Sequence, residues 1–187
     1  MVERCLHHYG LQFLTEKDGL NMATSILDGK RILAVDDEPD VLNVLEEELK
    51  EAAPGCIYEK ASTFEEAAEK FKSNIYDIVI LDIMGVRGFE LLDLAVKRNF
   101  RVAMLTAHAL NPEALKRSFE MKARAYLPKE KLGEIVPFLE DVLKLEYLPG
   151  WKKLMDKLKG FFDTKFESDW EKKTGLIWQE WGKMERR

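Results

Sequence analysis

Five short strand-like segments run through the chain, and four of them are almost wholly apolar. They cover residues 32–35, 57–61, 78–81, 102–105 and 125–127, and a helical pattern follows each one. Apolar strands that alternate with amphipathic helices are typical of a parallel sheet with helices on both faces. The sequence therefore predicts an α/β fold with a doubly wound, five-stranded parallel sheet and five helices.

Local signals place the helix boundaries. Pro39 opens a stretch in which apolar residues recur on one face, and a proline is well tolerated at the first helical position. Ser62 and Glu65 have capping-box spacing, which predicts a helix to about residue 74. Asn111 and Pro112 predict the start of another helix. The last helix of this unit is expected over residues 133–146.

The four apolar strands end in polar groups. These are Asp36 and Asp37, Asp82, Thr106 and Lys129. In a parallel sheet the carboxyl ends of the strands meet at one edge, where ligands bind. Three carboxylates in one small cleft repel each other unless a cation lies among them, and hard oxygen ligands suit Mg²⁺. A lysine and a hydroxyl could bind phosphoryl oxygens, so the pattern indicates metal-assisted phosphoryl transfer.

Four segments resemble signature segments of response-regulator receiver domains and occur in the same order: RILAVDDEPDVL, IVILDIM, MLTAHA and AYLPKE. The resemblance covers about residues 30–146 and implies a flavodoxin-like fold. It also implies a phosphorylation switch of a two-component phosphorelay, with a histidine kinase or a phosphotransfer protein as the donor. Such a domain is not an enzyme in the usual sense, because it catalyses only its own phosphorylation and dephosphorylation.

The resemblance assigns the metal and acceptor roles residue by residue. Asp82 would be the phosphoacceptor. Asp37 would bind Mg²⁺ directly, and Asp36 would do so directly or through water. Asp82 and the backbone carbonyl of Met84 would complete the protein ligands. Each aspartate also has a plain structural interpretation as a helix cap or turn residue.

The remaining implied roles concern the response to phosphorylation. Lys129 would pair with the phosphoryl oxygens, and Thr106 would move to hydrogen-bond the phosphoryl group. Tyr126 would change rotamer with Thr106, although it could equally be a packed aromatic. Ala107 would leave room over the site, and His108 could modulate hydrolysis of the acyl phosphate or simply lie in a surface loop.

Two departures from the family pattern stand near the site. The loop after Asp82 is about two residues short, and Glu130 replaces the proline that usually follows the lysine. Two alternative functions remain. One is an unphosphorylated, receiver-like interaction scaffold. The other is a haloacid-dehalogenase-type phosphohydrolase, which needs a second aspartate where this chain has Met84.

Both ends of the chain extend beyond the receiver-like part. Residues 1–29 are expected to be a poorly ordered extension, and residues 147–187 a helical extension with no DNA-binding output domain. All four tryptophans lie in this second extension: Trp151, Trp170, Trp178 and Trp181. Because exposed aromatic stripes are rare in monomers, we expect residues 151–181 to dock on the receiver or on a second copy. A protein-binding face is another interpretation, and a membrane-bound basic helix is a weaker one.

Composition and charge limit which binding partners and which cellular locations are expected. The formal net charge of -5 gives no general attraction to nucleic acid or to an anionic membrane. No apolar run approaches the ~20 residues needed to span a bilayer. The two cysteines, Cys5 and Cys56, follow no metal or redox spacing. We therefore expect a cytoplasmic protein whose cofactor is Mg²⁺.

Overall fold

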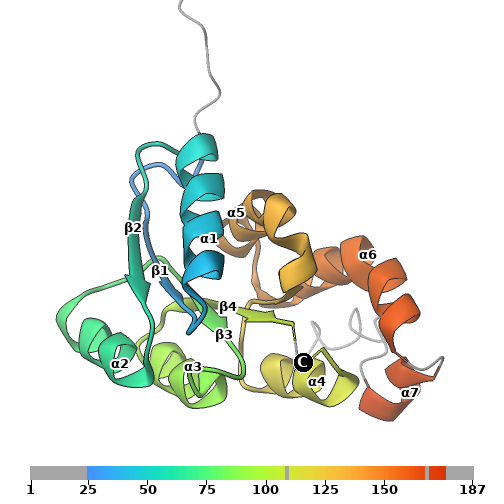
Figure 1. Ribbon diagram of the computed structural model, residues 1–187. Helices are drawn as coiled ribbons and strands as arrows, with labels where there is room; N and C mark the ends of the chain where they lie inside the picture. The colour runs from blue at the N-terminus through green and yellow to red at the C-terminus, as the bar shows by residue number, and fades with distance from the viewer. Residues whose placement is uncertain (1–24, 108–109, 167–168, 176–187) are drawn as a thin grey trace, which may run out of the picture.

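The computed structural model describes residues 25–107, 110–166 and 169–175 (Figure 1). One five-stranded sheet forms its centre, in the order β2-β1-β3-β4-β5, and every neighbouring pair is parallel. The strands are β1 (Arg31–Val35), β2 (Ile57–Ala61), β3 (Ile78–Asp82), β4 (Arg101–Thr106) and β5 (Ala125–Pro128). The predicted doubly wound parallel sheet is confirmed.

Helices cover both faces of this sheet. Helices α1 and α5 contact each other on one face, whereas α2 and α3 lie together on the other (Figure 1). A short 3₁₀ helix, η1, leads from β5 into α5. The helices are α1 (Pro39–Ala52), α2 (Phe64–Ser73), α3 (Gly88–Lys97), α4 (Pro112–Glu120), η1 (Lys129–Glu134), α5 (Ile135–Lys144), α6 (Tyr147–Lys165) and α7 (Trp170–Thr174).

The apolar pattern of the sequence explains where the core lies. All five residues of β3 are buried, as are the last four of β1, because both strands are covered on two sides. In α1, Leu42, Leu45 and Leu49 form the buried face. Asn111 caps α4 as predicted, accepting a hydrogen bond from the Ala114 N–H at 2.8 Å.

The cap of α2 differs from the prediction by one residue. Thr63, not Ser62, is the N-cap, and its hydroxyl oxygen accepts a hydrogen bond from the Glu66 N–H at 3.2 Å. The Glu66 carboxylate in turn accepts from the Ser62 N–H at 2.9 Å. The sequence contains the capping pattern twice, one residue apart. The later register is the one that buries Ala67 and Phe71.

The end of the N-terminal segment packs rather than extending freely. Leu27 is fully buried in the core, and the Ser25 hydroxyl donates to Glu140 Oε1 at 2.8 Å. Residues 25–29, expected to belong to a poorly ordered extension, therefore form part of the folded unit. Cys5 and the rest of residues 1–24 lie outside the described residues.

Helices α6 and α7 continue the chain and pack on it. Helix α6 contacts α5 and β5, and α7 contacts α4 (Figure 1). Trp151 is fully buried, and its indole N–H donates to the Ala123 carbonyl at 2.8 Å. Phe162 is also fully buried, and Trp170 is almost so. Trp178 and Trp181 lie outside the residues that the structure describes.

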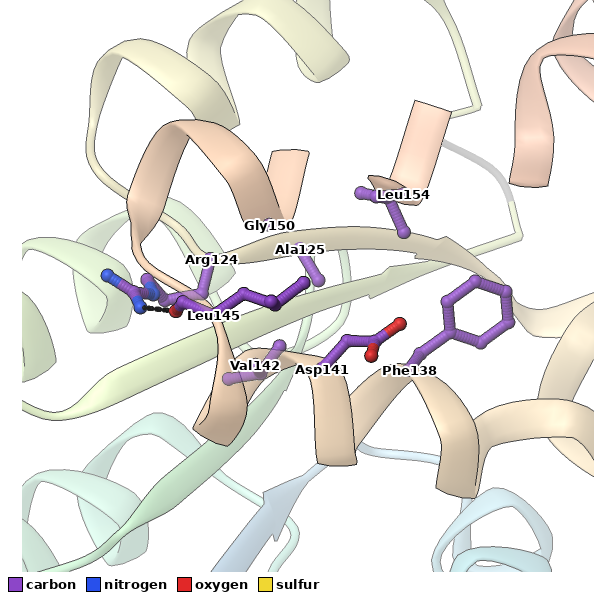
Figure 2. Close-up of a pocket in the computed structure, with 8 residues that line it drawn as sticks. All are labelled: Arg124, Ala125, Phe138, Asp141, Val142, Leu145, Gly150 and Leu154. Atoms are coloured by element: carbon purple, nitrogen blue, oxygen red, sulfur yellow. Dashed lines mark hydrogen bonds between the residues drawn. The ribbon is translucent and has the colours of Figure 1, made fainter. Parts of the chain in front are cut away.

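A pair of lysines fastens α6 to α5. Lys153 and Lys157 each lie 2.8 Å from a different oxygen of Asp141. Figure 2 shows Asp141 beside a cavity at this contact, lined also by Phe138, Leu154 and other residues of β5, α5 and α6. The cavity measures only ≈10 Å³, which is about the space of one water molecule. The two helices are thus closely packed, and this cavity is not a ligand site.

Candidate functional site

The sheet order brings three of the predicted site residues into direct contact. Asp36 follows β1, Asp82 ends β3, and Lys129 follows β5, so all three lie at the carboxyl edge. The Lys129 ammonium lies 2.8 Å from Asp36 Oδ2 and 3.1 Å from Asp82 Oδ1. These residues are distant in the sequence, and the parallel topology alone accounts for their meeting.

The Asp82 carboxylate has a fixed orientation. Its Oδ2 atom accepts hydrogen bonds from the backbone N–H groups of Met84 and Gly85, both at 2.8 Å. The residue is only 5% exposed. Its other oxygen faces Lys129, so one side of the carboxylate is held by the backbone and the other is directed toward a cation.

Asp36 lies deeper than its neighbour in the sequence. It is 1% exposed, and its Oδ1 atom accepts a hydrogen bond from the Glu38 N–H at 3.0 Å. Its Oδ2 atom forms an ion pair with Lys129. Burial raises the pKa of Asp36, although Lys129 and the Glu38 N–H oppose that effect.

Lys129 also contacts a carboxylate that the sequence analysis did not select. Glu38 Oε1 lies 2.7 Å from the ammonium, so three carboxylates surround one cation. Burial alone would lower the pKa of Lys129, but its hydrogen bonds to Asp36, Glu38 and Asp82 outweigh burial and raise it. The acidic run that continues from Asp37 into Glu38 was the signal that could have found this residue.

An open cleft adjoins this cluster. It has a volume of ≈330 Å³ and is lined by Asp37, Glu38, Asp82, Met84, Gly85 and Lys129. The Asp37 carboxylate lies against Gly85, because a Cβ atom on that glycine would come within 1.8 Å of Asp37 Oδ1. Gly85 is thus enclosed by two acidic side chains, and it too was missed by the sequence analysis.

The short loop after Asp82 depends on a second glycine. A Cβ atom on Gly88 would lie 2.0 Å from the Asp82 carbonyl oxygen, so α3 can begin this close to β3 only with glycine there. Arg87, just before it, adopts the left-handed conformation with φ 56°. Its guanidinium carbon lies 3.6 Å from the centroid of the Phe64 ring. The shortened loop is therefore closed by one close backbone approach, one left-handed residue and one cation–π contact.

The residues at this edge fit a magnesium ion by their chemistry. Asp37, Asp82 and Met84 line one open cleft, and Mg²⁺ binds a few carboxylate oxygens while keeping several waters. In the part of the chain that the structure describes, however, no three acidic, cysteine or histidine side chains are arranged so that together they could hold a metal ion. Lys129 instead lies between Asp36 and Asp82 and offsets their charge.

The other predicted residues do not line this cleft. Thr106 ends β4 and is fully buried. Tyr126 is fully buried in β5, where burial raises the pKa of its phenol despite an opposing hydrogen bond from the Asn111 backbone. Its ring centroid lies 6.1 Å from that of Phe162 in α6. Ala107 is exposed, and His108 lies outside the described residues.

Comparisons with known proteins agree with this arrangement. The family model described as the response regulator receiver domain matches residues 32–139. The two-component response regulator ARR18 of Arabidopsis thaliana is 35% identical over 105 residues, which are 53% of this chain and 16% of the plant protein. The chain therefore spans about a sixth of the length of that curated relative.

Solved structures show the same likeness. The response regulator TrrA of Thermotoga maritima, crystallised with Mg²⁺ and beryllium fluoride, has 36% identity and a TM-score of 0.53. It matches 61% of this chain and 99% of that one. A CheY-like receiver domain protein of Methanospirillum hungatei has 27% identity and a TM-score of 0.52, and the match covers 62% of this chain and 96% of that one.

Among the described helices, none is long and apolar enough to cross a membrane.

Proposed function

We propose, from the premise that this chain belongs to the response regulator receiver family, that it is a magnesium-dependent phosphorylation switch. Asp82 accepts a phosphoryl group from a histidine kinase or a phosphotransfer protein of a two-component phosphorelay. The observation that carries this proposal is the position of Asp82: one oxygen is held by two backbone N–H groups, and the other lies 3.1 Å from Lys129 beside an open cleft.

The proposed step is attack by an oxygen of Asp82 on the phosphorus of a phosphohistidine. The new O–P bond gives an acyl phosphate, the P–N bond breaks, and the imidazole leaves. Lys129 then exchanges its contact with Asp82 for one with a phosphoryl oxygen. Asp36, Asp37, Asp82 and the carbonyl of Met84 would hold Mg²⁺, which supplies positive charge for the phosphoryl oxygens.

A phosphohydrolase of the haloacid-dehalogenase type is disfavoured at this site. That class requires an aspartate two residues after the nucleophile to act as acid and base. Met84 occupies the position here, and its largely exposed thioether cannot carry a proton in that way. The proposal is therefore a signalling domain that acts on itself, placed in the cytoplasm with its phosphodonor partner.

We also propose that α6 and α7 connect this site to the protein's output. They cover α4, β5 and α5, the elements through which receiver domains are expected to respond, and Phe162 packs against Tyr126. Glu130, next to Lys129, lies 3.6 Å from Lys165 at the end of α6. A change at Lys129 and Tyr126 would then alter the packing of α6, exposing a surface for a protein partner or a second copy.

The acceptor assignment has a direct test. The parent protein, incubated with Mg²⁺ and acetyl phosphate, should gain the mass of one phosphoryl group, and Asp82→Asn should gain none. Asp93→Asn is the matched control, because Asp93 is an exposed aspartate of α3 paired with Lys97. It should label like the parent. Equal labelling of Asp82→Asn would refute the assignment.

A further inference from the structure

A second concave surface lies at the opposite edge of the sheet. It is formed where β4 and β5 begin, beside the ends of α3 and α4 and the start of α6. We call it the basic concavity; it has a volume of ≈410 Å³ and is lined by Val96, Asn99, Phe100, Arg101, Lys122, Arg124 and Tyr147. None of these residues belongs to the Asp82 site.

Most lysines and arginines of the described residues form an ion pair with an acidic side chain, but the cations around this concavity do not. Within the described ranges, neither Arg101, Lys122, Arg124 nor the adjacent Arg98 forms an ion pair, whereas most other lysines and arginines do. Burial lowers the pKa of Arg124, and the charge of Arg101 lowers it further. Arg101 and Arg124 therefore repel each other in the free protein.

The ends of helices offset only part of this charge. The carboxyl ends of α3 and α4 each contribute about half a negative charge, and the amino end of α6 about half a positive one. Glu146 is the acid that acts on Arg124, and it adds one negative charge. Against four cations, an excess of roughly 2.5 positive charges remains. Favourable interaction with helix ends therefore does not explain why all four cations gather here.

We propose that the basic concavity binds a small ligand that carries two adjacent phosphate groups. Guanidinium groups match phosphate oxygens in pairs, and two phosphates supply the charge that the site lacks. Two of the cations lie near the Tyr147 ring, with Lys122 Nζ at 5.0 Å and the Arg124 guanidinium carbon at 6.0 Å from its centroid. This ring keeps both side chains at the rim of the concavity.

The backbone at Lys122 supplies an independent way to test the role of its side chain. Lys122 follows the C-cap of α4 with φ 69°, a left-handed conformation in which glycine is the usual residue. Lys122→Gly should therefore raise the melting temperature while it removes one cation. If Lys122 had only a structural role, Lys122→Gly would raise the melting temperature without weakening the binding of the ligand.

The probe is inorganic pyrophosphate, titrated calorimetrically into the whole protein without divalent metal. The parent should bind it, and Arg101→Gln and Arg124→Gln should each weaken binding roughly tenfold or more, since each removes a charge-assisted hydrogen-bond donor. Lys122→Gly should bind more weakly although it is more stable. Lys72→Gln, which removes an exposed cation of α2, is the charge-matched control and should bind like the parent.

Binding at Lys129 is the competing explanation, because that ammonium could also take phosphate. Lys129→Gln should therefore keep the affinity of the parent. Loss of binding in Lys129→Gln with retention in Arg101→Gln would overturn the proposal. Equal weakening in Lys72→Gln and Arg124→Gln would do the same, because it would reduce the effect to general charge attraction.

Discussion

Lys129 is the cation that offsets the negative charge of the site. It faces three carboxylates, and its side chain is only 10% exposed. Removing one partner of a buried pair leaves an uncompensated charge, so Lys129→Ala should lower the free energy of unfolding by about 3 kcal/mol. Denaturant unfolding at neutral pH measures this loss. Lys131→Ala, which removes an exposed lysine of η1 paired with Glu134, is the control and should change little.

The same substitution separates phosphorylation from response. Lys129→Ala should still accept some phosphoryl group, because the proposed nucleophile and metal ligands remain. It should lose the conformational change, because the ammonium is what links the phosphoryl group to the strand that carries Tyr126. NMR spectra before and after acetyl phosphate provide the measurement. A response like that of the parent would contradict this role of Lys129.

Gly85 determines where the Asp37 carboxylate can lie. A methyl group at this position would come within 1.8 Å of Asp37 Oδ1, so Gly85→Ala must displace either the loop or the carboxylate. We expect Gly85→Ala to bind Mg²⁺ roughly tenfold more weakly, and Asp37→Ala to lose at least as much. Gly160→Ala in α6 meets nothing within 4 Å and is the control. Magnesium affinity equal to the parent's in Gly85→Ala would refute this dependence.

At the level of single residues, the strand-end rule was enough to predict that Asp36, Asp82 and Lys129 lie at one edge of the sheet. It works because apolar strands of known polarity bring their ends to one edge. The rule does not predict Glu38, Gly85 or Gly88. Their contacts depend on the path of the loops after β1 and β3, and no periodic pattern encodes that path.

Among the elements, α6 is held by both apolar packing and charge. Its Trp151 and Phe162 are fully buried, and its Lys153 and Lys157 pair with Asp141 of α5. Burial alone would raise the pKa of Asp141, but the two lysines outweigh burial and lower it. The stabilisation from this pair is therefore present above the unfolded pKa of about 4 and is lost as the pH falls through the folded value.

Asp141→Asn measures this contribution. At pH 7 the variant should be less stable than the parent by about 1 kcal/mol, because the two lysines are half-exposed and solvent weakens the pairs. The difference should shrink as the pH falls below about 4 and approach zero as it passes the lowered pKa of the folded state, where the parent carboxylate also takes up a proton. Urea unfolding over pH 3–7 provides the measurement. A difference that stays constant over this range would show that charge is not its cause.

The helices and strands themselves could be predicted from the spacing of apolar residues and from the residues typical of helix ends, apart from one cap. Proline at the start of α1 and α4 fixed those boundaries, since a missing N–H is harmless only in the first turn. The cap of α2 moved by one residue because two overlapping patterns satisfy the same rule. Helical spacing predicted α6, but spacing alone does not determine which surface a helix covers.

In the molecule as a whole, α6 and α7 occupy one flank of the sheet, where they pack on α5, β5 and α4 (Figure 1). Phe162 lies against Tyr126 in the middle of this flank, and Lys165 lies near Glu130 at the carboxyl edge. The start of α6 carries Tyr147 into the basic concavity at the other edge. A rearrangement of α6 would therefore change contacts at both edges of the sheet.

Tryptophan emission reports on this flank, because Trp151 and Trp170 are buried there. We use a Trp178→Phe/Trp181→Phe variant, so that only these two indoles emit. If phosphorylation loosens α6 and α7, acetyl phosphate with Mg²⁺ should shift the emission to longer wavelength, since the indoles gain water. A tighter packing should shift it to shorter wavelength. The same variant with Asp82→Asn should show neither shift. Unchanged emission in protein shown by mass to be phosphorylated would mean that phosphorylation does not change the free-energy difference between the two packings, and that these helices do not carry the output.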